Sequence, residues 1–243
     1  MDLKRIHNVY FIGIGGIGMS ALARYFKFVE KNVAGYDKTR TPLTKELSGL
    51  SIDIHYEDDT ALISSSYKNR ENTLVVYTPA VPVEHTEYQY FLENGFTIKK
   101  RSEVLGWITK DSFCLAVAGT HGKTTTTSIL AHLLKETGVG FTGFLGGISE
   151  DFNSNFVFEG TDYSVVEADE FDRSFLRLFP DVACITSMDA DHLDIYGNSK
   201  ELEKSFIEFA NKVSPGGALF VRKGLPLEGI TYGIEDDADY CVT

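Results

Sequence analysis

Cysteine and long apolar runs are scarce in this 243-residue sequence, and each scarcity excludes a class of protein. The only cysteines, Cys114, Cys184 and Cys241, are odd in number and far apart, which argues against a disulfide framework and a zinc site. No apolar stretch approaches the roughly 18 residues of a membrane-spanning helix, and the N-terminal run is too short for a signal peptide. We therefore expect a soluble, cytoplasmic protein with reduced thiols.

Basic residues are few in the second part of the chain. Residues 1–110 contain 14 Lys and Arg against 13 Asp and Glu, whereas residues 111–243 contain 9 against 22. A nucleic-acid-binding surface needs clustered Lys and Arg to neutralise phosphates, so this distribution argues against DNA or RNA as a partner. The sequence does not specify an oligomeric state.

Apolar runs rich in Val, Ile, Phe and Tyr alternate with segments of helical period along the whole chain. This pattern is typical of parallel sheets with crossover helices, and the length allows two such domains. We predict a first α/β domain over 1–110 and a second over 111–243. The expected strands are 7–12, 32–36, 52–55, 73–77, 97–100, 113–119, 140–145, 162–167, 182–186, 218–222 and 230–234. The expected helices are 16–28, 42–48, 86–94, 102–109, 123–137 and 199–212.

A glycine-rich turn, Gly13-Ile14-Gly15-Gly16-Ile17-Gly18, follows the first expected strand and opens a helix. In that context a GxGxxG pattern lets the backbone and the helix N-terminus approach a diphosphate, and Asp37 stands where a ribose-binding acid is expected. The literal interpretation is NAD binding, but any anionic nucleotide satisfies the same geometry. A turn that only packs helix against strand is the simplest alternative.

A second loop, Gly119-Thr120-His121-Gly122-Lys123-Thr124-Thr125, follows the buried strand FCLAVA. It has the parts of a phosphate-binding loop: a glycine turn, a lysine that reaches the β- and γ-phosphates, and a Thr124 hydroxyl for magnesium. It lacks the first glycine of GxxxxGK[ST], because Val117 occupies that position. This shorter form separates the loop from most GTPases and motor ATPases.

Two further strands end in acidic clusters. Glu167-Ala168-Asp169-Glu170-Phe171-Asp172 follows one, and Asp189-Ala190-Asp191-His192-Leu193-Asp194 follows the other. A carboxylate at the end of a strand next to a phosphate loop holds magnesium in P-loop folds, so Glu167 is a candidate metal ligand. A histidine beside aspartates just past a strand end can complete a metal shell or orient a phosphate, so His192 is a second candidate. Solvated acidic loops are the alternative, and Arg173 and Arg177 offset part of the repulsion.

Lesser features lie at the ends of other strands. The segment 78–82, with Thr78 first, follows the fourth strand of the first domain and is placed to line the crevice beside the glycine turn. His55 ends the third strand within reach of the same crevice, and a plain surface position is the alternative for it. Gly146-Gly147 allows a close backbone approach to substrate. The one basic run, 99–101, is either a solvated face or a neighbour of a bound anion.

Taken in order, these motifs closely resemble the Mur ligase family over essentially the whole chain. The resemblance is carried by GIGGIGMSALA at 13–23, YTPAVP at 77–82, RSEVLGWI at 101–108, GTHGKTTTTS at 119–128, EADEFDRSF at 167–175 and DHLDIYG at 191–197. It implies a Rossmann-like UDP-binding domain, a P-loop ATPase-type central domain that uses ATP and Mg²⁺, and a third domain that receives an amino acid. The glycine-rich stretch favours the branch that joins L-alanine to UDP-N-acetylmuramate through an acyl phosphate.

The resemblance also implies roles for individual residues. Those expected to contact the sugar nucleotide are Gly13, Gly15, Gly16, Ile17, Gly18, Met19, Ser20, Asp37, His55 and Thr78. Those expected to hold ATP are Gly119, Thr120, His121, Gly122, Lys123, Thr124 and Thr125. The catalytic residues implied are Lys123, Glu167 and His192, and the magnesium ligands implied are Thr124, Glu167 and His192.

The sequence departs from the family pattern at two points that bear on the expected activity. Ser187 stands where the family commonly has Asn, which puts one amide contact to substrate in doubt. The end of the central domain and the third domain are absent, so we expect a fragment that binds nucleotides without completing ligation.

Other functional classes remain as alternatives. One is a dehydrogenase domain fused to a P-loop kinase, and another is a nucleotide-binding regulator or scaffold without ligase activity. A ligase of the folylpolyglutamate synthase type shares the ATP loop, but it does not begin with GIGGIGMSALA on a separate domain.

Overall fold

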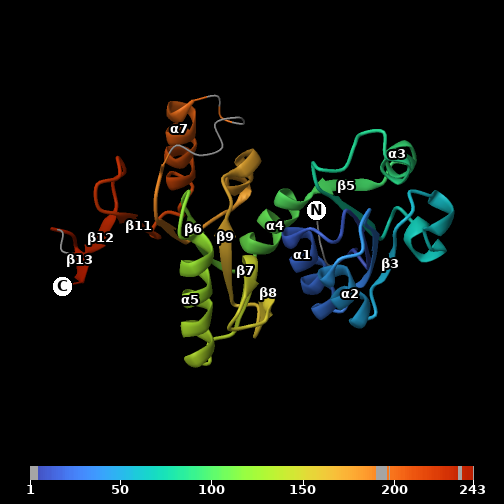
Figure 1. Ribbon diagram of the computed structural model, residues 1–243, viewed down its shortest axis with the longest axis horizontal. Helices are drawn as coiled ribbons and strands as arrows, with labels where there is room; N and C mark the ends of the chain where they lie inside the picture. The colour runs from blue at the N-terminus through green and yellow to red at the C-terminus, as the bar shows by residue number, and fades with distance from the viewer. Residues whose placement is uncertain (1–4, 190–195, 197, 235–236, 243) are drawn as a thin grey trace. The chain divides into compact units, whose positions relative to one another are not determined.

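The structure is a computed structural model that describes residues 5–189, 196, 198–234 and 237–242 (Figure 1). The chain divides into two compact units, Met1–Val104 and Leu105–Thr243. Helix α4 (Arg101–Lys110) contains the division. The domain boundary expected between residues 110 and 111 stays a prediction. No helix in the described part of the chain is both long and apolar enough to cross a membrane.

The first unit is a five-stranded parallel sheet of order β3-β2-β1-β4-β5. Its strands are β1 (Asn8–Ile12), β2 (Asn32–Tyr36), β3 (Asp53–His55), β4 (Thr73–Tyr77) and β5 (Thr97–Lys100). The connections contain helices α1 (Ile17–Phe28), α2 (Pro42–Gly49) and α3 (Thr86–Glu93), with the 3₁₀ turns η2 (Thr60–Leu62) and η3 (Ser65–Lys68). The central strand β1 is buried along its whole length, as expected for a parallel strand covered on both faces. The Rossmann-like fold class is confirmed.

The second unit is an eight-stranded sheet of order β13-β12-β11-β10-β6-β9-β7-β8. Its strands are β6 (Phe113–Ala118), β7 (Phe141–Ser149), β8 (Ser154–Phe158), β9 (Tyr163–Ala168), β10 (Val182–Ile185), β11 (Ala218–Arg222), β12 (Ile230–Ile234) and β13 (Tyr240–Val242). The helical elements are α5 (Lys123–Glu136), the 3₁₀ segment η4 (Phe171–Arg177) and α7 (Ser199–Ala210). Because β6 lies between β9 and β10, the phosphate loop that follows β6 is flanked by the ends of two neighbours.

One part of this sheet differs from the expectation of parallel strands. The strand expected over 140–145 continues to Ser149 and pairs antiparallel with β8, which the sequence analysis did not predict. Asn153 adopts a left-handed conformation, with φ of 47°, in the turn that joins the two strands. The periodicity misses β8 because the strand follows directly on a polar turn and begins with Ser154 and Asn155, so no apolar run marks its start.

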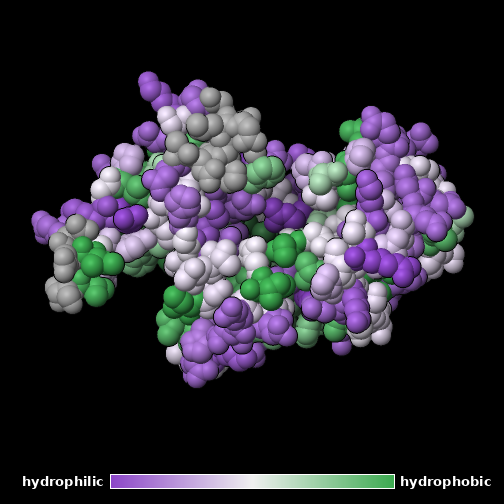
Figure 2. Space-filling model, viewed as in Figure 1, coloured by the Kyte–Doolittle hydropathy of each residue, from purple (hydrophilic) through white to green (hydrophobic). Residues whose placement is uncertain are grey.

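Apolar side chains fix the layers in each unit. In the first unit a cluster that includes Tyr10, Tyr67 and Phe91 fills the space between the sheet and α3. In the second unit Ala131 of α5 packs on Phe141 and Val165. Apolar surface is left exposed on β12 and β13, where Ile234 and Val242 lie (Figure 2).

A buried ion pair links β1, β3 and α3 in the first unit. His55 Nε2 lies 2.7 Å from the Tyr10 hydroxyl and 3.1 Å from Glu87 Oε1, and its Nδ1 lies 2.9 Å from the Glu57 carbonyl. The Tyr10 hydroxyl donates to the fully buried Glu87 at 2.7 Å. Burial alone lowers the pKa of His55. The Glu87 carboxylate, the Glu57 carbonyl and the Asp53 charge outweigh burial, and the pKa of His55 is raised above 6.5.

The raised pKa of His55 predicts a pH dependence of stability. A group whose pKa is higher in the folded state than in the unfolded state contributes fully to the free energy of unfolding below its unfolded-state pKa. This contribution is lost as the pH rises through the folded-state pKa. Glu87→Gln removes one partner of a buried pair, so we expect a loss of about 3 kcal/mol in the free energy of unfolding at pH 6 and a smaller loss at pH 9. Urea unfolding at the two pH values measures both.

His132→Gln is the matched control for this prediction. His132 lies 2.6 Å from Asp151 in the second unit, and both side chains are about half exposed. We expect it to change stability little at either pH. An equal loss at pH 6 and pH 9 for Glu87→Gln would contradict the assignment of the pH dependence to His55.

Candidate functional site

The glycine turn of the first unit is tied to the end of β2. The N–H groups of Gly13 and Ile14 donate to the Tyr36 carbonyl at 2.8 and 3.0 Å, and the Gly15 N–H donates to Asp37 Oδ2 at 2.6 Å. A Cβ on Gly15 would lie 2.8 Å from that Asp37 oxygen, so only glycine fits. The turn therefore has one fixed conformation before any ligand arrives.

Helix α1 begins directly after this turn, with Gly16 as its N-cap and no acidic residue in its first turn. The first-turn residues Ile17, Gly18, Met19 and Ser20 are those expected at a diphosphate. A helix N-terminus whose N–H groups have no side-chain cap favours an anion.

The end of β4 lies against the same turn. Gly13 has a φ of +87°, and a Cβ there would lie 2.9 Å from Thr78 Cγ2 and 3.3 Å from Val81 Cγ2. The strand order reverses between β1 and β4, and ligands of open parallel sheets bind at such a switch point, beyond the carboxyl ends of the strands. The structure thus brings Thr78 and the glycine turn together.

Asp37 and His55 have protein partners in this structure. The Asp37 carboxylate accepts from the N–H groups of Gly15 and Thr39, and His55 belongs to the buried ion pair with Glu87. Their expected contacts with ribose and uracil remain predictions.

Arg101 lies against the first turn of α1, a placement that the sequence analysis left open. A Cβ on Gly18 would lie 2.8 Å from Arg101 Cδ and 2.9 Å from its Nη1. The guanidinium therefore adds positive charge beside the helix N-terminus. The spacing of 83 residues hides this contact, which depends on β5 lying beside β4.

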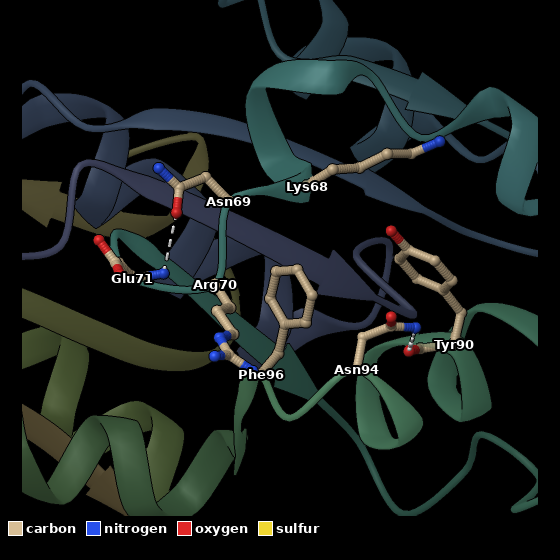
Figure 3. Close-up of a pocket in the computed structure, with 7 residues that line it drawn as sticks. All are labelled: Lys68, Asn69, Arg70, Glu71, Tyr90, Asn94 and Phe96. Carbon is tan, nitrogen blue, oxygen red and sulfur yellow. Dashed lines mark hydrogen bonds between the residues drawn. The ribbon is translucent and has the colours of Figure 1, made fainter.

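A surface hollow of about 430 Å³ lies elsewhere on the first unit (Figure 3). Its lining residues are Lys68, Asn69, Arg70, Glu71, Tyr90, Asn94 and Phe96. Residues 68–71 precede β4 and Phe96 precedes β5, so the hollow lies at the amino-terminal edge of the sheet. The glycine turn follows β1 at the opposite edge, and the hollow is separate from the crevice.

The phosphate loop of the second unit is held by the end of β10. Gly119 and Gly122 have φ of +137° and +82°, conformations that favour glycine. Ser187 Oγ accepts from the His121 N–H at 2.7 Å and lies 2.8 Å from Thr120 Oγ1. Ser187 thus holds the loop itself.

Lys123 starts α5 and points back into the loop. Its ammonium donates to the Gly119 carbonyl at 2.6 Å and lies 2.9 and 3.0 Å from the two carboxylate oxygens of Glu170. The Glu170 side chain is completely buried. In the sequence Glu170 is one of four carboxylates in a run, and nothing there distinguishes it as the partner of the lysine.

Glu167 and Thr124 meet at the mouth of the loop. The Glu167 carboxylate accepts from the Thr124 hydroxyl and from the Gly146 N–H, the latter at 3.0 Å. Burial raises the pKa of Glu167, and the two hydrogen bonds and the Lys123 charge oppose that rise. Hydroxyl and carboxylate oxygens are ligands that Mg²⁺ prefers, so this donor set fits magnesium.

The remaining expected residues of this site are less constrained. His121 is exposed, and its Nε2 lies 3.8 Å from Asp189 Oδ2. Thr125 lies in the first turn of α5 and is exposed. His192, the third expected magnesium ligand, lies outside the described residues.

A glycine turn at the switch point of one unit and a glycine-rich loop between two strand ends of the other define a two-unit α/β protein with a candidate anion site in each unit. The family comparison agrees, since residues 8–113 match the Mur ligase family, catalytic domain, and residues 117–239 match the Mur ligase middle domain. The chain belongs to the Mur ligase family.

Two UDP-N-acetylmuramate–alanine ligases are similar to this chain over both of its units. UDP-N-acetylmuramate–L-alanine ligase of Flavobacterium psychrophilum is 63% identical over 240 residues, which cover 99% of this chain and 53% of that protein. The structure of UDP-N-acetylmuramate-alanine ligase from Thermotoga maritima has a TM-score of 0.79 at 29% identity, covering 94% of this chain and 53% of that one.

A third similar protein is the Neisseria meningitides ligase for UDP-N-acetylmuramate and L-alanyl-gamma-D-glutamyl-meso-diaminopimelate. Its structure has a TM-score of 0.81 at 25% identity, covering 91% of this chain and 72% of that one. The chain spans about half the length of the curated relatives it matches.

The contact of Gly146 with Glu167 predicts that alanine substitution at Gly146 and at its neighbour Gly147 affects ATP binding very differently. A Cβ on Gly146 would overlap the Glu167 carboxylate, whereas a Cβ on Gly147 would meet Thr124 Cγ2 at an ordinary 3.6 Å. We expect Gly146→Ala to weaken Mg²⁺-dependent ATP binding about tenfold or more, as the loss of a charge-assisted contact does. Gly147→Ala, the matched control, is expected to bind as the unchanged chain does.

Calorimetry of ATP with and without Mg²⁺ measures this difference. Equal affinities for the two alanine variants would show that the position of Glu167 does not matter for the metal nucleotide.

Proposed function

We propose that this chain carries the UDP-sugar-binding and ATP-binding parts of a ligase of peptidoglycan precursor synthesis. The ligase joins L-alanine to the carboxylate of UDP-N-acetylmuramate at the expense of ATP. The observation that carries the proposal is the pairing of a glycine turn at a switch point with a loop that assembles Lys123, Thr124 and Glu167. The 63% identity to a protein named for this reaction supports the choice of substrates.

The first unit binds the sugar nucleotide in this proposal. Backbone N–H groups of the glycine turn and the start of α1 hold the diphosphate, and Arg101 adds positive charge. Asp37, His55 and Thr78 face the ribose and uracil. This use of backbone donors agrees with the near-neutral composition of residues 1–110.

The second unit binds ATP and Mg²⁺. The loop over 119–125 wraps the phosphates, and Lys123 contacts the β- and γ-phosphate oxygens. Thr124 and Glu167 would hold one magnesium ion, and His192 would hold a second. Bound Mg²⁺ neutralises phosphate charge and polarises the γ-phosphoryl group.

The reaction has two steps. A carboxylate oxygen of the muramyl group attacks the γ-phosphorus and ADP leaves, which gives an acyl phosphate. The L-alanine nitrogen then attacks the acyl carbon, loses a proton, and phosphate leaves from a tetrahedral intermediate. Two anions must meet in the first step, so Lys123 serves to reduce their repulsion and to align them.

All the proposed substrates are water-soluble, and we place the protein in the cytoplasm. The proposal involves no nucleic acid and no insertion into a membrane.

Two substitutions test the assignment of one ligand to each unit. Gly15→Asp puts a charged side chain against Asp37 and into the diphosphate site, so we expect it to abolish binding of UDP-N-acetylmuramate and leave Mg-ATP binding unchanged. Lys123→Ala is expected to do the reverse. Calorimetry of each ligand against each variant measures both effects.

Gly49→Ala is the control for the first substitution, because nothing lies within 4 Å of its added Cβ. Unchanged binding of both ligands to both site variants would refute the site map.

A further inference from the structure

The Lys123 ammonium has two protein partners that face it from different elements. The Gly119 carbonyl lies 2.6 Å away in the loop, and the Glu170 carboxylate oxygens lie 2.9 and 3.0 Å away, past the end of β9. The lysine side chain is 13% exposed and the glutamate side chain is 0% exposed. The pair is therefore shielded from solvent but next to the phosphate site.

The number of donors on the ammonium limits what it contacts. A lysine ammonium has three N–H donors, and these two partners occupy at least two. At most one donor is left for a phosphate oxygen. Because the four-carbon stem of lysine is flexible, the two partners decide where that donor points.

Glu170 is itself fixed by contacts that do not involve Lys123. Its carbonyl accepts from the Tyr196 hydroxyl at 2.5 Å and from the Arg173 N–H at 2.9 Å. Tyr196 is buried, and Phe175 of the same segment stacks on Phe209 of α7 at 4.9 Å. The carboxylate therefore belongs to a packed segment, and the lysine is the flexible partner.

We propose that Glu170 is the positioning residue of Lys123, which it holds against the Gly119 carbonyl with one N–H directed at the phosphates. The inference rests on the proposed binding of ATP by the second unit. This inference is opposite to the simple electrostatic expectation. The Glu170 carboxylate repels a nearby triphosphate, so charge alone predicts that removing the carboxylate tightens ATP binding. The sign of the effect therefore distinguishes positioning from plain charge.

The test compares Mg-ATP affinities, measured by calorimetry, for the unchanged chain and a set of variants. We expect Glu170→Gln to weaken binding about tenfold, which corresponds to one hydrogen bond to a charged group. Glu170→Asp keeps the charge within reach of the flexible lysine and is expected to recover most of the loss. Binding of UDP-N-acetylmuramate by the first unit is expected to stay unchanged in both variants.

Asp189→Asn is the matched charge control. Asp189 follows β10 beside the loop, its side chain is 68% exposed, and its N–H contact to Thr120 Oγ1 at 3.0 Å is kept in the variant. We expect this loss of negative charge to leave Mg-ATP binding unchanged or tighter.

Three outcomes would overturn the inference. If Glu170→Gln binds Mg-ATP as tightly as the unchanged chain or more tightly, Glu170 acts only as a charge that repels the phosphates. Equal losses in Glu170→Gln and Glu170→Asp would show that the carboxylate does not act on the lysine. A tenfold loss in Asp189→Asn would make the effect one of general charge.

Two further variants keep the test decisive. If Glu170→Gln does not fold, Tyr196→Phe takes its place, because it releases the Glu170 carbonyl and keeps both charges. We expect it to weaken Mg-ATP binding about fivefold, as the loss of a neutral hydrogen bond does, and unchanged binding would overturn the inference. Absence of Mg-ATP binding by the unchanged chain, or normal binding by Lys123→Ala, would instead refute the proposed function.

Discussion

Parallel strands that run in one direction end at one edge of their sheet, and both candidate sites depend on this constraint. In the first unit the ends of β1 and β4 bring Gly13 and Thr78 into contact. In the second unit β6 lies between β9 and β10, so residues that are 47 to 67 positions apart in the chain share one small volume. The close approach leaves little room for side chains, which is why glycine stands at the turn and in the loop.

The strongly acidic second unit contains few cations, and its carboxylates have distinct environments. Glu170 is buried against Lys123, and Glu167 accepts two hydrogen bonds at the mouth of the loop. Asp169 accepts from the N–H of Phe171 at 3.0 Å, which shapes the turn after β9. Glu167 lies with Thr124 where the donor set fits a metal ion, whereas Glu170 binds the lysine and Asp169 shapes the turn.

The candidate anion site of the first unit is built from backbone groups. Its turn presents backbone N–H groups and a helix N-terminus, and Asp37 fixes the conformation of that turn by accepting from Gly15. The Arg101 guanidinium, from the far end of the unit, lies against the first turn of this helix. A preformed turn loses little conformational entropy on binding, which favours affinity without a large basic surface.

Periodicity and glycine spacing were sufficient to place the strands β1 to β5 and the α-helices α1 to α4 to within one residue, but they did not predict the 3₁₀ turns η2 and η3. Buried parallel strands are short apolar runs bounded by turns, and this signal is local. The same reasoning found the two loops and the candidate ligands Thr124 and Glu167. It did not predict β8, because this segment forms a strand through its antiparallel hydrogen bonds to β7.

The sequence by itself determined the fold class, the order of the motifs and the kinds of atoms that each site offers, because these follow from local composition and spacing. Only the tertiary structure decided that Glu170 pairs with Lys123, that Gly146 must lack a side chain beside Glu167, and that Arg101 reaches α1. Each of these contacts joins residues that are 21 to 83 positions apart, and their meeting depends on strand order and side-chain packing, which no local pattern encodes.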